Sequence, residues 1–223
     1  MERNLGVLIC GNNELLRLAQ RLRYDVYCEE LKRSSPYADH NQRVIADDLD
    51  RFGCTFLAVE HGQPIGSIRI NFSSEGSLGS YERWYGLERS EFFPHGTGIA
   101  TKLVVKKSKR GSSTAIKLMS SAARYFTERG GMEAYMDCVS SLIPYYLAIG
   151  WMEYGHEFDH PENGPSQPMR LDRRGLDRLA KGPSFLDYVR LYSGAKLLAW
   201  RKRKTSGQAK INSSREDKNV YMA

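Results

Sequence analysis

A chain of 223 residues, with 41% hydrophobic and 11% aromatic side chains, is long enough for one well-packed domain and short for two. No apolar run approaches the roughly 20 residues of a membrane span, and the apolar run at residues 5–10 is too short for a secretion signal, so we expect a soluble, cytoplasmic protein. Cys10, Cys28, Cys54 and Cys138 have neither CxxC spacing nor histidines at zinc-site spacing, which argues against a disulfide scaffold and predicts reduced thiols and no metal site.

The formal net charge of +7 is concentrated at the C-terminus. Residues 201–223 hold seven Lys or Arg against two Asp or Glu, and few of them are apolar. Such a segment cannot bury enough surface to offset its ordering entropy, so we expect a domain at residues 1–200 and a disordered basic tail at residues 201–223. The tail leaves a non-enzymatic alternative, a nucleic-acid-binding module, but the rest of the chain has little excess charge, and we therefore expect no nucleic-acid partner.

Hydrophobic periodicity and turn residues predict the elements of the domain. Residues 73–98 have no clear period and are expected to be a loop with a short helix, of a kind that often lines a site. In chain order we predict a strand at 5–10, a helix at 15–31, a hairpin of strands at 54–60 and 64–72, the short helix at 81–87, a strand at 99–105, a helix at 112–129, a strand at 132–139, a short helix at 140–149, strands at 151–158 and 169–171, and a helix that opens at Ser184.

Hairpins in the first half, followed by alternating strands and helices, indicate an α/β (α+β) fold. We predict a single domain with a mixed central β-sheet, helices on both faces, a C-terminal helix and the flexible basic tail. No internal repeat is visible in the sequence.

The segment after the predicted strand 99–105 carries the first chemical signal. A basic run leads into small residues where the next helix is expected to begin, so backbone N–H groups and the partial positive charge of the helix N-terminus can approach a phosphate there. This pattern predicts a phosphorylated carrier or cofactor as ligand. The residues concerned are Lys106, Lys107, Lys109, Arg110, Gly111, Ser112, Ser113, Thr114 and Ala115.

The same turn resembles the pyrophosphate loop Q/R-x-x-G-x-G/A of the GNAT superfamily of N-acyltransferases. Arg110 stands first in the pattern, Ser113 replaces the usual glycine, and Ala115 is last. The resemblance implies that the turn binds the phosphate of an acyl-4′-phosphopantetheine donor, with no other bound cofactor.

A second motif lies at the expected distance from the turn. Residues 145–151, Tyr-Tyr-Leu-Ala-Ile-Gly-Trp, resemble the aromatic-Tyr-x-x-hydrophobic-Gly-aromatic element of the superfamily. The resemblance implies that Tyr146 stands near the thiol leaving group as a general acid. We expect a backbone N–H around Val104 and Val105 to polarise the thioester carbonyl.

Three elements of the N-terminal half resemble acyl-homoserine-lactone synthases and the related N-acyl amino acid synthases. They are Arg23-Tyr-Asp-Val-Tyr27, Asp47-x-x-Asp50 and Gly66-Ser-Ile-Arg69, which match R-x-x-V-F, D-x-x-D and G-S-x-R. Because the lactone synthases carry glutamates where this chain has Ile45 and Ile99, the lactone synthase is kept as the alternative. The resemblance implies transfer of a long-chain acyl group from acyl carrier protein, or from acyl-CoA, to the α-amine of an amino acid, with tyrosine as the family precedent.

Charged side chains are the first candidates for the acceptor site. Arg23, Asp47, Asp50 and Arg69 are expected to form an ion-pair network at the entrance, in which the carboxylates would hold an ammonium group and Arg69 a carboxylate. The alternative is that these residues form structural salt bridges only.

Aromatic residues of the loop, Tyr81 and Trp84, are the further candidates for the acceptor site. The group that deprotonates the amine is not assigned by the sequence. His40, His95, Asp47 and Glu91 are candidates.

Five positive charges within nine residues lie beside the predicted phosphate turn. Acyl carrier proteins are strongly acidic, so we expect a basic docking surface for one of them here. An acetyl-CoA-dependent N-acetyltransferase would share the turn and Tyr146 without needing this surface, and remains an alternative. We expect a monomer whose product associates with membranes. The docking residues are Lys102, Lys106, Lys107, Lys109 and Arg110.

Overall fold

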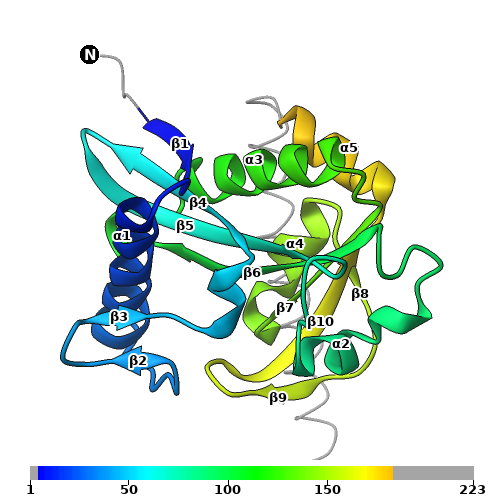
Figure 1. Ribbon diagram of the computed structural model, residues 1–223, viewed down its shortest axis with the longest axis horizontal. Helices are drawn as coiled ribbons and strands as arrows, with labels where there is room; N and C mark the ends of the chain where they lie inside the picture. Colours follow the sequence, from blue (N-terminus) through cyan, green and yellow to red (C-terminus); the bar gives the residue numbers. More distant parts are fainter. Residues whose placement is uncertain (1–4, 183–223) are drawn as a thin grey trace, which may run out of the picture.

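An eight-stranded mixed β-sheet forms the centre of the computed structural model, which describes residues 5–182 (Figure 1). Its strands are β1 (Leu5–Ile9), β4 (Cys54–Glu60), β5 (Gln63–Phe72), β6 (Thr97–Val105), β7 (Glu133–Cys138), β8 (Met152–Glu153), β9 (Phe158–His160) and β10 (Gly164–Leu171). The strand order is β1-β4-β5-β6-β7-β10-β8, with β9 also paired to β10. Only β6 and β7 run parallel, and the other neighbours are antiparallel.

The helices cover both faces of this sheet (Figure 1). They are α1 (Asn13–Tyr24), which continues as a π-helical segment (Asp25–Glu30), α2 (Ser80–Tyr85), α3 (Thr114–Glu128), α4 (Ile143–Ala148) and α5 (Arg173–Lys181). Along β4, Phe56 and Ala58 belong to the hydrophobic cluster under α3, whereas Leu57 between them belongs to the cluster under α1. Because side chains of a strand alternate between faces, α1 and α3 lie on opposite sides of the sheet. This arrangement confirms the predicted fold class.

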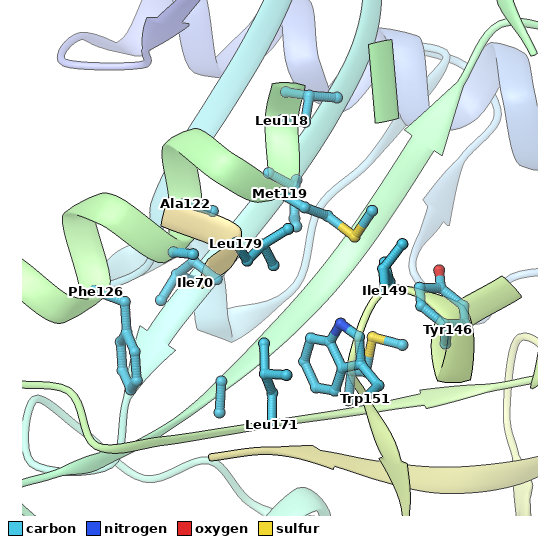
Figure 2. Packing of buried hydrophobic residues seen from close by; sticks show 14 of the residues in the cluster. Ile70, Leu118, Met119, Ala122, Phe126, Tyr146, Ile149, Trp151, Leu171 and Leu179 are labelled. Atoms are coloured by element: carbon cyan, nitrogen blue, oxygen red, sulfur yellow. The ribbon is translucent and has the colours of Figure 1, made fainter. Parts of the chain in front are cut away.

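The larger hydrophobic cluster fills the space between the sheet and the helices α3 and α5 (Figure 2). Phe126 of α3 is 1% exposed and lies where two glycines leave room for its ring. A Cβ on Gly98 would lie 2.7 Å from the Phe126 ring, and one on Gly131 only 2.3 Å from it. Tyr146 and Trp151 belong to the same cluster, so the core extends to the region around α4.

The parallel ladder between β6 and β7 is short. It pairs residues 97–99 with residues 133–135, although β6 runs on to Val105 and β7 to Cys138. In the same stretch β6 bulges, because its register with β5 shifts between the pairs Arg69–Thr101 and Ser67–Val104, and Lys102 adopts a left-handed φ of 55°. The two strands therefore separate beyond Ile99 and leave an opening in the middle of the sheet.

The structure differs from the sequence prediction at several elements. The strand predicted at 151–158 is interrupted at Gly155, which has a φ of 63°, and becomes the short strands β8 and β9. The predicted strand at 169–171 extends back to Gly164. Two elements were not predicted, namely α5 and a small separate hairpin of β2 (Ala38–Asp39) and β3 (Val44–Ile45).

The remaining predicted elements are confirmed to within a few residues at their ends. Asn12 caps α1, since its side chain accepts a hydrogen bond from the Leu15 N–H at 2.9 Å. The helix predicted from Ser184 and the basic tail at 201–223 lie outside the described residues. Among the helices of residues 5–182, none is both long enough and apolar enough to cross a lipid bilayer.

Candidate active site

A cavity of about 370 Å³ occupies the opening between β6 and β7. One wall is β6 from Ala100 to Val105, and the facing wall is the end of β7 from Met136 to Cys138. The π-helical segment after α1, the helices α2 and α4, and the loop after β9 close the remaining sides. The residues that line these sides come from these segments and from the chain next to them. They are Val26, Tyr27, Leu31, Arg33, Tyr81, Arg110, Val139, Ser141, Leu142, Tyr146, His160, Glu162 and Asn163.

A second cavity, of about 280 Å³, lies beside the basic turn. It shares Val105, Arg110 and Leu142 with the first, so the two are neighbours across the end of β6. A long ligand can therefore have one end at the turn and the other end in the opening. The remaining lining residues are Lys109, Gly111, Ser112, Ala115, Ile116, Tyr145 and Ile149.

The turn between β6 and α3 has the geometry of an anion site. Gly111 adopts a φ of 78°, a conformation that favours glycine. Ser113 makes no side-chain cap at the start of α3, while the Thr114 N–H donates to the Ser112 hydroxyl at 3.2 Å. Ala115 lies in the first helical turn, whose N–H groups have no acceptor within the helix. These N–H groups suit a phosphate in the second cavity.

The basic side chains beside the turn are only partly free to meet a partner. Lys109 forms an ion pair with Glu60, and Arg110 forms one with Glu30 at 2.6 Å. Glu30 also accepts hydrogen bonds from the backbone N–H of Lys107, at 2.9 and 3.1 Å. Among the described residues, the side chains of Lys106 and Lys107 form no ion pair, and Lys107 is exposed.

Lys102 does not belong to the exposed basic surface on which it was predicted. It is 5% exposed, and its ammonium group pairs with Glu162 and, at 3.4 Å, with Asp47. The reason is the bulge in β6, where the left-handed backbone of Lys102 departs from the regular alternation of the strand. Its side chain consequently lines the cavity instead of facing solvent.

Arg23, Asp47, Asp50 and Arg69 form the predicted network, but in the interior of the protein. Arg69 donates to Asp47 at 2.5 Å, to Asp50 at 2.8 Å and to the Thr101 hydroxyl at 3.1 Å, and all three of its nitrogens are used within the protein. Arg23 donates to Asp50 at 2.9 Å. Neither arginine side chain is exposed at all.

None of these four residues lines either cavity, so the structure favours the structural alternative over direct contact with a substrate.

The pKa of Asp47 bears on its candidacy as a base. Burial alone would raise this pKa, but the charges of Arg69, Lys102 and Arg23 together lower it to about 2. Asp47 is therefore a very weak base. The other three predicted candidates, His40, His95 and Glu91, are exposed and lie outside both cavities.

The two aromatic candidates for the acceptor site, Tyr81 and Trp84, differ in their position relative to the larger cavity. Tyr81 lines the larger cavity, and its hydroxyl lies 3.1 Å from Nε2 of His160. Trp84 does not line the cavity and stacks on Phe158, with 4.7 Å between the ring centroids.

Tyr146 lines the larger cavity and is 7% exposed. In Figure 2 it lies beside Ile149 and Trp151 at one end of the hydrophobic cluster. Burial raises the pKa of Tyr146 well above its usual value, because a phenolate would be poorly solvated there. Tyr146 thus keeps its proton at neutral pH and can donate a hydrogen bond. Val104 and Val105 line the facing side of the opening.

The structure adds polar residues to the cavity that the sequence prediction missed. They are Arg33, Asp137, His160, Glu162 and Asn163. The only sequence signal among them is Asp137, an acid between apolar residues near the end of a predicted strand. The other four come from loops or strand ends with no distinguishing pattern.

The model of the N-acyl amino acid synthase FeeM family matches residues 18–172 of this chain. The chain belongs to that family. The match covers both halves of the opening, from α1 to the end of β10. No curated protein matches the chain in sequence.

Solved structures of related proteins share the fold. The structure of FeeM, an N-acyl amino acid synthase from uncultured soil microbes, is 14% identical with a TM-score of 0.62, covering 81% of this chain and 98% of that one. The acyl-homoserine lactone synthase LasI is 16% identical with a TM-score of 0.64, and the match covers 82% of this chain and 98% of LasI. The lactone synthase BjaI is 16% identical with a TM-score of 0.63, and the match covers 86% of this chain and 99% of BjaI. The fold is GNAT-like, as the sequence motifs imply, and the protein is an N-acyltransferase.

The buried network makes a prediction about stability. Arg69→Ala leaves Asp47 and Asp50 buried without their shared partner, so we expect the free energy of unfolding to fall by about 3 to 5 kcal/mol. Urea denaturation measures this change. Arg69→Lys keeps a positive charge but not the forked geometry of the guanidinium, so we expect its free energy of unfolding to lie between those of the wild type and Arg69→Ala. Arg51→Ala is the matched control, since Arg51 and Asp48 are 82% and 88% exposed, and we expect a change within about 0.5 kcal/mol. If the free energy of unfolding fell by the same small amount in all three variants, a structural role for the network would be contradicted.

Proposed function

We propose that this N-acyltransferase moves a long-chain acyl group from the thioester of an acyl carrier protein to the α-amine of an amino acid. The observation that carries this proposal is the adjacency of two cavities, one beside the basic turn at residues 106–115 and one in the opening between β6 and β7. The donor's phosphate binds at the backbone N–H groups of residues 110–115, and its pantetheine arm runs past Val105 into the opening. The acceptor enters the polar side of the larger cavity.

The chemistry of transfer follows from what faces the thioester in the opening. A backbone N–H of β6 around Val104 and Val105, next to the bulge, polarises the thioester carbonyl. Tyr146 donates its hydroxyl proton to the departing sulfur. Because the raised pKa of Tyr146 makes its phenolate a stronger base than a thiolate, the amine must return a proton to Tyr146 as the C–S bond breaks.

An apolar space for the acyl chain adjoins the opening. A small cavity of about 20 Å³ lies between the sheet and the helices α3 and α5, and it shares Ala100 with the larger cavity. All of its lining residues are apolar, among them Met119, whose flexible side chain can change rotamer to admit a longer chain (Figure 2). A fatty acyl chain would enter here only if Met119 and its neighbours moved to enlarge the cavity.

The identity of the donor's carrier is the finer part of the proposal. Lys106 and Lys107 lie next to the second cavity without ion-pair partners among the described residues, so they suit the acidic surface of an acyl carrier protein. The structure of BjaI is described as that of a CoA-dependent synthase, and acyl-CoA is therefore the alternative donor for this fold. Tyrosine is the first acceptor to test.

The reaction can be tested by mass spectrometry of organic extracts from bacteria that express the protein, compared with an empty-vector control. We expect new long-chain N-acyl amino acids, whose masses identify both acceptor and acyl length. Tyr146→Phe removes the proton donor and should lower the yield by about 100-fold or more. Tyr154→Phe, which lies outside both cavities, should leave it unchanged. New lactones instead of N-acyl amino acids would show that the proposed acceptor is wrong.

Carrier-protein docking is tested by reversing the two lysine charges. We expect Lys106→Glu with Lys107→Glu to lower kcat/KM for acyl carrier protein by about 10-fold or more at low salt, because electrostatic steering mainly affects association. Rates with a short acyl-pantetheine should hardly change. Lys117→Glu, an exposed charge on α3, is the control. An equal loss with acyl-pantetheine would mean that the lysines act on catalysis and not on docking.

A further inference from the structure

Three side chains with a carboxylate or imidazole line the larger cavity among residues 5–182, namely Asp137, His160 and Glu162. If the proposed function holds, the acceptor amine arrives as an ammonium ion and must lose a proton before it can attack a thioester. The contacts of the three side chains decide which of them can receive that proton.

Glu162 is already occupied by protein groups. One of its carboxylate oxygens pairs with the ammonium group of Lys102, and the other accepts a hydrogen bond from the Ser35 hydroxyl at 2.5 Å. Its side chain is only 3% exposed. Glu162 therefore holds Lys102 in place and has little capacity for a substrate ammonium.

His160 also has both of its nitrogens engaged. Its Nδ1 accepts a hydrogen bond from the Glu162 N–H at 3.1 Å, so in the neutral ring the proton must be on Nε2. Nε2 then donates that proton to the Tyr81 hydroxyl oxygen, 3.1 Å away. Burial lowers the pKa of His160, which agrees with a neutral ring. In this arrangement His160 orients Tyr81 and is not a base.

Asp137 is the carboxylate with a free position. Its Oδ1 accepts a hydrogen bond from the Tyr85 hydroxyl at 2.6 Å, whereas Oδ2 has only a long contact of 3.5 Å with the amide nitrogen of Asn163. No Lys or Arg of the described residues forms an ion pair with Asp137. A carboxylate at the wall of a cavity without a cation is suited to an incoming ammonium.

The same asparagine connects Asp137 to a cation that forms no ion pair among the described residues. Arg33 lines the cavity, forms no ion pair among the described residues, and donates to Oδ1 of Asn163 at 2.7 Å. The two ends of one side-chain amide thus face one carboxylate and one guanidinium. A carboxylate and a guanidinium that form no ion pair, joined by one amide, have the charges that suit the ammonium and carboxylate of a free α-amino acid.

We propose that Asp137 and Arg33 bind the α-ammonium and α-carboxylate of the acceptor, and that Asp137 is the base of the reaction. The ammonium gives one proton to Oδ2 of Asp137, and the lone pair of the resulting amine attacks the thioester carbon. The C–N bond forms and the C–S bond breaks, while Tyr146 protonates the sulfur and takes the second amine proton. One hydrogen stays on the amide, and Asp137 releases its proton to solvent.

Purified variants test the two roles separately. The wild type is first assayed with hexadecanoyl-CoA or the same acyl group on carrier protein, and with each amino acid, to find the acceptor. We expect Asp137→Asn to lower kcat at neutral pH by about 100-fold or more, and the rate to recover as the pH rises towards the pKa of the amine itself. Such recovery would not occur if the variant were merely misfolded. Asp159→Asn, which changes an exposed acid on β9, is the control.

The role of Arg33 is tested by substrate choice. We expect the wild type to prefer the amino acid to its decarboxylated amine by about 10-fold or more, since the amine has no carboxylate to accept a charge-assisted hydrogen bond from Arg33. Arg33→Ala should raise KM for the amino acid and abolish this preference, with little change for the amine. A wild type that acylates no amino acid would overturn the proposed function. A wild type that does so, with Asp137→Asn and Arg33→Ala unchanged, would overturn only the present inference.

Discussion

Beyond Ile99 the strands β6 and β7 no longer pair, and the whole site depends on this separation. Where two parallel strands separate inside a sheet, their backbone N–H and C=O groups lose each other as hydrogen-bond partners. The gap between them must then be occupied by side chains or by a ligand. Here the gap holds a cavity with the basic turn at residues 106–115 on one side and a polar wall on the other. The bulge at Lys102 lies in this unpaired stretch of β6, and it turns that lysine inward to meet Glu162.

The buried charges keep this opening in place. Arg69 on β5 joins the segment that contains Asp47 and Asp50 to Thr101 on β6, and Lys102 joins the same Asp47 to the loop that carries Glu162. Such a network is costly to desolvate, and its value lies in the single arrangement that satisfies all of its members. The residues that resemble family motifs near the N-terminus thus act on the site through the shape of its wall.

Local patterns in the sequence were sufficient for the fold and for one side of the site. The strands, the helix α3 and the turn at residues 106–115 each follow from periodicity or turn chemistry within a short segment. The helix α5 was missed because it is short and Gly175 and Asp177 lower its helix propensity, although packing against α3 holds it in place and Asp172 caps it. The burial of Lys102 was missed because a bulge leaves no mark in the sequence, and a lysine beside a basic run resembles surface. Arg33, Asp137 and Asn163 come from three distant segments, and only the tertiary fold brings them together.

The most direct test of the proposed path is a crystal structure with an acyl-4′-phosphopantetheine analogue in which a stable amide replaces the thioester. We expect the phosphate within hydrogen-bond distance of the N–H groups at residues 110–115, the amide between Val104 and Tyr146, and the acyl chain directed towards Ala100. An analogue bound with its phosphate elsewhere, or with the opening between β6 and β7 empty, would contradict that path.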